Sequence, residues 1–232
     1  MRINKDEFDQ DAERLAAGAA DFGIALSAEQ IQQFRNFQDL ITEWNRRLNL
    51  TRITPEDFVP LHFLDSLCLM SFIPQKRPLR LLDLGSGAGF PGIPLAITDP
   101  DLDITLLEAT QKKARFLVHA VRTLELPRIS VLPLRAEEAA RMPGYHCGYD
   151  IVAARAVAPL DRLCGWMMPF LKPDGVAIAM KADTTRTREE LKKSEKAIQL
   201  AGGEMVKAVV IGLPATDIQR TLVLIKRRRL KR

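Results

Sequence analysis

The sequence predicts a doubly wound α/β fold, with a seven-stranded, mostly parallel sheet whose last strand is antiparallel, and with a helical segment ahead of it. Three observations predict this class. Apolar runs of strand length alternate with helical stretches from Leu79 onward. The last two runs are separated only by residues 212–217, which favours an antiparallel hairpin. The first 75 residues carry apolar residues at helical spacing instead.

Composition narrows the class of protein. The 232 residues include three isolated cysteines without C-x-x-C pairing, so we expect neither a disulfide framework nor a metal site. These are Cys68, Cys147 and Cys164. The first residues lack the apolar core of a signal peptide, and no apolar run approaches about 18 residues. We therefore expect a cytoplasmic, monomeric protein without a membrane segment. Three histidines do not cluster and are expected in packing or at the surface: His62, His119 and His146.

The net charge of +5 is concentrated at the carboxyl end. Residues 226–232 carry six positive charges, and removing them leaves −1 for the rest of the chain. A basic terminus favours contact with nucleic acid, and the alternative is a solvated end. We therefore divide the chain into a helical segment at 1–75, packed on an α/β domain at 76–225, and a basic tail at 226–232.

Two helices are expected before residue 50. Residues 1–22 predict a polar, weakly amphipathic helix, and Ser27 with Gln30 predicts a capping box at the start of the next. An apolar stripe along the second helix predicts packing against the following domain, and its members are Ile31, Phe34, Phe37, Ile41, Trp44 and Leu48. Four polar side chains around the end of this helix can face a polyanion: Asn45, Arg46, Arg47 and Asn49.

Another helical stretch follows. Thr54 is the expected cap, with Pro55 at the first helical position. Pro60 is expected to break this helix, and a second piece then runs through residues 62–67.

Seven apolar runs predict the strands of the sheet. Their bounds are Leu79–Leu84, Ile104–Glu108, Ile129–Leu134, Tyr149–Ala154, Val176–Met180, Glu204–Ile211 and Gln219–Ile225. Helices fit between the first six runs, and a turn at 171–175 with a proline and a glycine precedes the fifth. Ligands of doubly wound sheets bind at the carboxyl ends of the strands, near the point where strand order reverses. We expect the functional site there.

A glycine-rich turn joins the first strand to a helix. Gly85, Gly87 and Gly89 permit left-handed backbone and close approach of a ligand to the helix N-terminus. A dinucleotide site is one interpretation, since Gly87, Gly89 and Gly92 match G-x-G-x-x-G. That match begins after Gly85 has already opened the turn, and the carboxylate of Asp83 would repel a pyrophosphate. A ligand with a cationic amino group suits Asp83 better, so S-adenosyl-L-methionine is favoured over a nicotinamide cofactor.

Two later strand ends supply further candidate contacts for this cofactor. Glu108 ends the second strand, where an acid can accept both ribose hydroxyls of a nucleoside, and the alternative is a helix cap with Thr110. Ala136 and Glu137, with Arg135 before them, are expected to end the third strand, a place that lies along the adenine in methyltransferases. The alternative for them is a surface salt bridge. Glu108 fits either class of cofactor and does not discriminate between them.

The loop after the fourth strand faces the acceptor in such a fold, and it offers no general base. It lacks the Asn/Asp-Pro-Pro-aromatic motif used on exocyclic amines and the cysteine nucleophile used on ring carbons. Arg155 is a hydrogen-bond donor only and cannot take up a proton. Guanine N7 has a lone pair and no proton to lose, so a site with Arg155 and Lys181 suits its methylation by orientation. Arg155 would hold a phosphate, the guanine O6 or the donor's carboxylate, and the alternative is a structural arginine.

Several stretches of the chain resemble one family. Residues 82–95, LDLGSGAGFPGIPL, contain a Pro-Gly-Ile-Pro sequence that is unusual among methyltransferases. Residues 44–51, 62–67 and 155–160 are also family-like. Together they resemble the family of ribosomal RNA small subunit methyltransferase G, also known as glucose-inhibited division protein B. The resemblance covers about residues 26–225, most of the chain.

The resemblance implies a class I S-adenosylmethionine-dependent methyltransferase fold and methylation of guanine N7 in the 530 loop of 16S ribosomal RNA. It implies that Gly85 and Phe90 border the donor, that Ala136 and Glu137 lie along its adenine, and that Arg155 is at the site.

Two positions depart from the family pattern: Glu108 stands where relatives often have Asp, and Ala182 follows Lys181 where many have Gly. Two other functions stay open from the sequence. One is a non-catalytic RNA-binding factor for assembly of the small ribosomal subunit, and the other is a methyltransferase acting on a small molecule or a protein.

Overall fold

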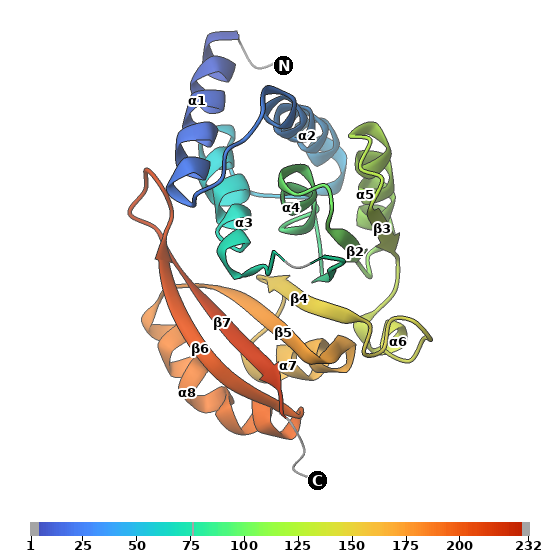
Figure 1. Cartoon of the computed structure of the whole chain (residues 1–232). Helices are drawn as coiled ribbons and strands as arrows, with labels where there is room; N and C mark the ends of the chain where they lie inside the picture. Colours follow the sequence, from blue (N-terminus) through green and yellow to red (C-terminus); the bar gives the residue numbers. More distant parts are fainter. Residues whose placement is uncertain (1–4, 76, 229–232) are drawn as a thin grey trace.

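Seven strands form one sheet in the order β3-β2-β1-β4-β5-β7-β6 (Figure 1). The structure, a computed structural model, describes residues 5–75 and 77–228. The strands are β1 (Arg80–Leu84), β2 (Asp103–Leu107), β3 (Ile129–Leu132), β4 (Tyr149–Arg155), β5 (Leu171–Ala182), β6 (Gly203–Gly212) and β7 (Gln219–Arg227). β1 to β5 pair in parallel, and β7 runs antiparallel to both β5 and β6. The predicted sheet and its antiparallel last strand are confirmed.

Helices cover both faces of the sheet (Figure 1). One face carries α1 (Lys5–Asp21), α2 (Ala28–Leu48), α3 (Asp65–Leu67), α4 (Gly92–Thr98) and α5 (Gln111–Thr123). The other carries α6 (Ala136–Ala139), α7 (Leu160–Met167) and α8 (Thr185–Leu200). Short turns of other helix types complete the chain: η1 (Pro55–Asp57), η2 (Val59–Leu64), η3 (Met70–Phe72) and η4 (Met168–Phe170). Because successive strand residues point to opposite faces, Leu81 joins one hydrophobic cluster and Leu82 the other.

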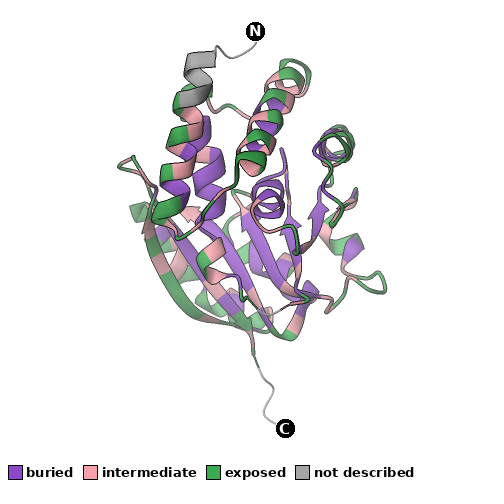
Figure 2. Cartoon of the chain, turned by 45° about the horizontal axis from the view of Figure 1, so that its top comes forward, coloured by how far each residue is buried: buried purple, intermediate pink, exposed green. Residues whose placement is uncertain are grey.

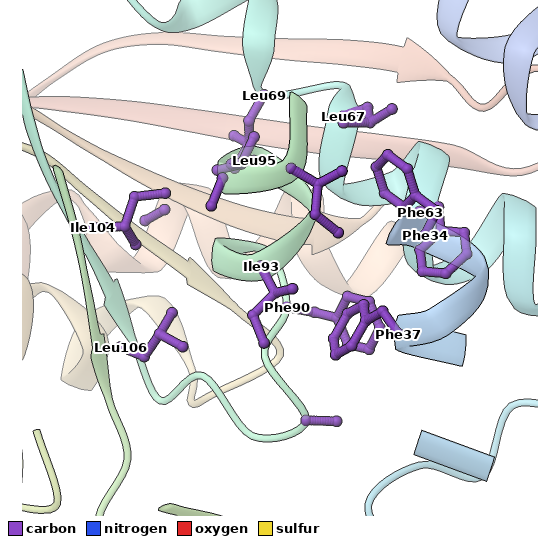
Figure 3. Packing of buried hydrophobic residues seen from close by; sticks show 14 of the residues in the cluster. Phe34, Phe37, Phe63, Leu67, Leu69, Phe90, Ile93, Leu95, Ile104 and Leu106 are labelled. Atoms are coloured by element: carbon purple, nitrogen blue, oxygen red, sulfur yellow. The ribbon is translucent and has the colours of Figure 1, made fainter. Parts of the chain in front are cut away.

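The N-terminal helices share a core with the sheet. Phe34 and Phe37 of α2 are fully buried and lie near Phe90 and Ile93, which follow β1 (Figure 3). Strand residues on the same face, such as Ile104, belong to the same cluster. Figure 2 shows buried residues both on these helices and along the strands that they cover, so the helical segment and the sheet share one core. The packing predicted for the apolar stripe of the second helix is confirmed, and so is the capping box of Ser27 and Gln30.

Pro60 does not break the helical stretch, contrary to expectation. It lies at the start of η2, a π-helix, and the chain continues from there directly into α3. Proline is tolerated in a first helical turn because its missing N–H would have no partner there. Thr54 has the extended backbone of an N-cap, but its side chain makes no capping hydrogen bond.

The predicted turn at 171–175 is also wrong. β5 already begins at Leu171, which pairs with Tyr149, and the register then shifts so that Ile151 pairs with Val176. The proline and the glycine therefore mark a bulge inside the strand rather than its start.

At the carboxyl end, β7 continues to Arg227, so Lys226 and Arg227 pair within the sheet. Arg228 follows the strand and donates its backbone N–H to the carbonyl of Gly202, and residues 229–232 of the predicted tail lie outside the described residues. No helix in the described part of the chain is long and apolar enough to cross a membrane.

Candidate functional site

The glycine turn lies between β1 and α4, at the carboxyl end of the first strand. Gly85, Gly87 and Gly89 all have positive φ, at 74°, 59° and 96°. A Cβ on Gly85 would lie 2.8 Å from Cγ2 of Val157, in the loop after β4. Only glycine can take this backbone conformation at this distance without displacing the loop. The turn therefore meets the loop after the fourth strand, as the expected placement of the site requires.

Asp83 lies beneath this turn and is completely buried. Its Oδ2 accepts a hydrogen bond from the backbone N–H of Gly92 at 3.0 Å. Its Oδ1 is also buried. Among the buried side-chain nitrogen and oxygen atoms of the described residues, it is the one that has no hydrogen-bond partner. Burial raises the pKa of Asp83 to about 7, against the opposing effect of the Gly92 N–H. A buried acceptor without a partner favours a bound group that donates hydrogen bonds.

Glu108 follows β2 and ties that strand to the turn. Its Oε2 accepts from the backbone N–H of Gly87 at 2.9 Å, and its Oε1 accepts from Thr110 at 2.7 Å. Thr110 is the N-cap of α5, so the helix-cap alternative describes part of what this carboxylate does. A carboxylate oxygen can accept two hydrogen bonds, and each oxygen of Glu108 accepts one here. Glu108 therefore keeps acceptor capacity for a ribose hydroxyl.

Ala136 and Glu137 do not end a strand. β3 stops at Leu132, and these two residues open the short helix α6, with Arg135 as its N-cap. Ala136 is half-buried and Glu137 is exposed. They remain at the carboxyl end of β3, beside the end of β2 that carries Glu108.

Phe90 closes the turn and is buried against aromatic rings of the N-terminal segment. The His62 ring stacks on it, with centroids 4.1 Å apart, and Phe58 meets it edge-on at 6.2 Å. The Cζ of Arg155 lies 4.8 Å from the centre of the same ring. Phe90 thus connects the turn, the end of β4 and the helical segment.

Arg155 ends β4 and is held by groups from the N-terminal segment. Its Nη1 donates to Oδ2 of Asp65 at 3.1 Å and to the carbonyl of Leu61 at 3.2 Å, and its Nη2 donates to Nδ1 of His62 at 3.0 Å. Asp65 also accepts from Nε of Arg220 in β7 at 2.8 Å. Burial lowers the pKa of Arg155, and the adjacent Asp65 opposes that shift. These contacts match the structural alternative, and a role for Arg155 at the site stays a prediction.

His62 is fixed in one neutral tautomer by these contacts. Because Arg155 donates to its Nδ1, that nitrogen is the acceptor, and Nε2–H donates to Oγ1 of Thr51 at 2.8 Å. Burial and the nearby Arg155 lower the pKa of His62 to about 3. His62 was expected in packing, and the sequence pattern gave no separate role to Asp65 or Arg220. His62 and Asp65 do lie in the family-like stretch 62–67, which was the available signal.

Lys181 lies under the loop after β4. Its Nζ donates to the carbonyl of Ala158 at 2.7 Å and to Oε1 of Glu190 in α8 at 2.8 Å. The same Glu190 oxygen accepts from the backbone N–H of Leu160. Lys181 and Glu190 together therefore hold both sides of the loop. No sequence signal had marked Glu190.

The residues at the ends of β1 and β2 fit S-adenosylmethionine. The partnerless Oδ1 of Asp83 suits its ammonium group, and the acceptor oxygens of Glu108 suit its ribose. Without a Cβ, Gly85 lets the backbone of the turn lie directly against Val157 of the loop after β4. Among the described residues, no three His, Cys, Asp or Glu side chains gather in a group that could hold a metal ion.

Comparisons with known proteins agree on one family. The family model described as rRNA small subunit methyltransferase G matches residues 30–222. The chain is 41% identical over 214 residues to the ribosomal RNA small subunit methyltransferase G of Acetivibrio thermocellus, covering 92% of this chain and 87% of that protein. It is 39% identical over 208 residues to the protein of the same name from Geobacillus kaustophilus, covering 89% and 87%.

Solved structures share the fold at low sequence identity. A SAM-dependent methyltransferase from Aquifex aeolicus matches with a TM-score of 0.54 and 15% identity, over 74% of this chain and 93% of that one. TYW2 of M. jannaschii, in complex with AdoMet, matches with a TM-score of 0.51 and 14% identity, over 66% and 70%. At these identities the likeness establishes the fold.

Proposed function

The chain belongs to the rRNA small subunit methyltransferase G family, and on that basis we propose that it methylates N7 of a guanine in the 530 loop of 16S ribosomal RNA, with S-adenosylmethionine as the donor. The observation that carries the proposal is the glycine turn over buried Asp83, in a chain that matches the family model from residue 30 to 222. The substrate belongs to the small ribosomal subunit, which places the activity in the cytoplasm.

Donor binding falls to residues at the carboxyl ends of the first three strands. Bound there, S-adenosylmethionine supplies a methyl group on a positively charged sulfur. Asp83 offers its free Oδ1 to the ammonium group, and Glu108 offers acceptor oxygens to the ribose. The backbone of Gly85, Gly87 and Gly89 would border the donor, and Phe90, Ala136 and Glu137 would form the remaining borders of its site.

The acceptor side requires orientation rather than proton transfer, because guanine N7 attacks through a lone pair and has no proton to lose. Arg155 has five N–H donors, and three hydrogen bonds occupy it within the described residues. The capacity left over suits a phosphate, the guanine O6 or the donor's carboxylate, but not N7 itself, which must stay open to the methyl group. Lys181 acts by holding the loop after β4 through Ala158.

The test is transfer of label from tritiated S-adenosylmethionine to small ribosomal subunits that lack the mark. We expect label in 16S ribosomal RNA, at a guanine that borohydride and aniline cleave as 7-methylguanine. Large subunits and the Asp83→Asn variant are the negative controls. Label in a protein or a small molecule would overturn the proposal, and RNA binding without transfer would support a non-catalytic assembly factor instead.

A further inference from the structure

Five exposed basic side chains lie where the end of α2 meets the start of α5. They form a surface, the basic corner, made up of Arg46, Arg47, Arg52, Lys112 and Arg115. Two segments that are far apart in the sequence supply it, and in Figure 1 these two helices lie side by side. The tertiary structure therefore creates a concentration of charge that neither segment has alone.

Contacts between the two helices establish that these ends coincide. Near the start of α2, Nε2 of Gln33 donates to the carbonyl of Leu124 just after α5, at 3.1 Å. Near the end of α2, the Trp44 ring lies 5.7 Å from Phe116 and 5.3 Å from His119. The helices therefore run antiparallel, and the carboxyl end of α2 lies beside the amino end of α5.

Helical periodicity places the cations around these ring contacts. Arg47 comes one turn after Trp44 in α2. Lys112 comes one turn before Phe116, and Arg115 comes one turn before His119. The rings of Phe116 and His119 both contact Trp44.

Arg52 joins the same surface because the chain folds back after α2. Asn49 takes the left-handed conformation that ends the helix. The Asn45 side chain then donates to the carbonyl of Thr51 and accepts from its N–H, both at 2.9 Å. Asn45 is thus occupied with the backbone instead of facing a polyanion, and its contacts bring Arg52 back beside the helix end.

The basic corner borders the proposed active site on two sides. Arg52 follows Thr51, whose Oγ1 lies 2.8 Å from Nε2 of His62, and the His62 ring stacks on Phe90 at the glycine turn. On the other side, Lys112 lies in the first turn of α5, four residues after Glu108, which accepts the N–H of Gly87 in the glycine turn. A nucleic acid lying on the corner would therefore reach the residues that surround the reacting base.

These charges are available to a ligand. Within residues 5–75 and 77–228, none of the five takes part in a salt bridge. The cations that line the site itself, Arg155, Lys181 and Arg220, are each paired with a carboxylate. Glu43, one turn before Arg47, is an exposed acid of α2 near the corner, and it offsets one of the five positive charges there.

We propose that the basic corner binds the phosphate backbone of the substrate RNA next to the target nucleotide; the identity of the partner rests on the proposed function. Arginine suits phosphate through bidentate hydrogen bonds, and lysine through its concentrated charge. Such contacts fix the position of a nucleic acid without selecting its sequence. The corner therefore sets where the RNA lies, and the site beside it selects the guanine.

The test measures binding of a fluorescein-labelled RNA hairpin that carries the 530-loop sequence, over a range of salt concentrations. The triple variant Arg47→Gln/Arg52→Gln/Lys112→Gln should bind at least about tenfold more weakly at low salt. The slope of log K against log salt should lose about 0.7–0.9 per contact removed, or about two units in all. A hairpin with a scrambled loop should show the same loss of slope, because backbone contacts are insensitive to sequence.

Matched variants make the result specific. Lys192→Gln/Lys193→Gln/Lys196→Gln removes three exposed charges from α8, on the other face of the sheet, and should leave the slope almost unchanged. The charge-conserving variant Arg47→Lys/Arg52→Lys/Lys112→Arg should retain it. Equal losses in the α8 variant, or an unchanged slope in the triple variant, would overturn the basic corner as the binding surface. Methyl transfer is assayed separately, so weakened binding in a protein that transfers no methyl group would support the corner while the proposed function failed.

Discussion

The imidazole of His62 lies flat on the ring of Phe90, with 4.1 Å between centroids and 4° between planes. Phe90 closes the glycine turn after β1, and His62 belongs to η2 in the N-terminal segment. The ring is held in place by Arg155 at Nδ1 and by Thr51 at Nε2. This one contact therefore joins the helical segment to the donor side of the proposed active site, and it requires a neutral histidine.

Acid should destabilise the protein through His62. Burial and Arg155 lower its pKa from an ordinary 6.5 to about 3. Between these values the unfolded chain binds a proton at His62 that the folded chain does not, so this part of the stability is present above about pH 6.5 and is lost as pH falls toward 3. Urea midpoints measured at falling pH should drop more steeply for the wild type than for His62→Gln. The exposed His119→Gln variant should follow the wild type, and parallel curves for all three proteins would contradict the assignment.

Donor affinity should rise with pH through the titration of Asp83. Burial raises the pKa of Asp83 to about 7, so at lower pH the folded protein without ligand holds a proton there that an unfolded chain would release. That contribution to stability is present in acid and is lost as pH rises toward 7. A cationic ligand requires the charged carboxylate, so calorimetric affinity for S-adenosylmethionine should increase between about pH 6 and 8. Asp83→Asn should bind weakly at every pH, because its neutral amide does not titrate. A pH-independent wild-type affinity would contradict the predicted contact.

Replacing Gly85 with alanine should impair donor binding beyond the effect of backbone strain. Gly85 and Gly202 have similar positive φ, at 74° and 80°, so alanine at either costs roughly 1–2 kcal/mol in stability. A Cβ at Gly85 would also press on Val157 at 2.8 Å, whereas nothing lies within 4 Å of one at Gly202. We expect Gly85→Ala to lower S-adenosylmethionine affinity by about tenfold or more, equivalent to about 1.4 kcal/mol. Gly202→Ala should lose stability alone, and Gly85→Ala/Val157→Ala should recover part of the affinity.

Lys181 and Glu190 should act as one unit in methyl transfer. Both hold the loop after β4, so Lys181→Met and Glu190→Ala should reduce the rate to similar extents, and the double variant should be little worse than either single one. Each single variant should also lose about 1 kcal/mol of stability, because it leaves a half-buried polar group without its partner. Arg188→Gln breaks a salt bridge that an exposed arginine of the same helix α8 makes, and it serves as the control, with little expected loss of stability. A rate lost in Lys181→Met but kept in Glu190→Ala would indicate direct contact between Lys181 and the substrate.

Features that depend on neighbours in the sequence were predictable. The alternation along β1 separates Leu81 and Leu82 onto opposite faces, and the spacing of Phe34 and Phe37 places both on the buried side of α2. Two of the predictions that failed concern prolines. Pro60 occupies a π-helical first turn, and the bulge in β5 extends through a stretch that has the composition of a turn. Pro60 is tolerated for a local reason, because its missing N–H would have no partner in a first turn, whereas in β5 the pairing with β4 extends the strand through the stretch of turn composition.

The amino-acid sequence by itself determined the order of strands and helices, the glycine turn, and the candidate donor residues Asp83 and Glu108, because each depends on periodicity or spacing within a few residues. Only the tertiary structure decided what surrounds Arg155. Its partner Asp65 also binds Arg220, which lies 155 residues further along the chain. Pairing across such a separation depends on how the N-terminal helices pack on the sheet, and local sequence carries no record of it. The basic corner arises in the same way, since its charges come together only where α2 and α5 run antiparallel.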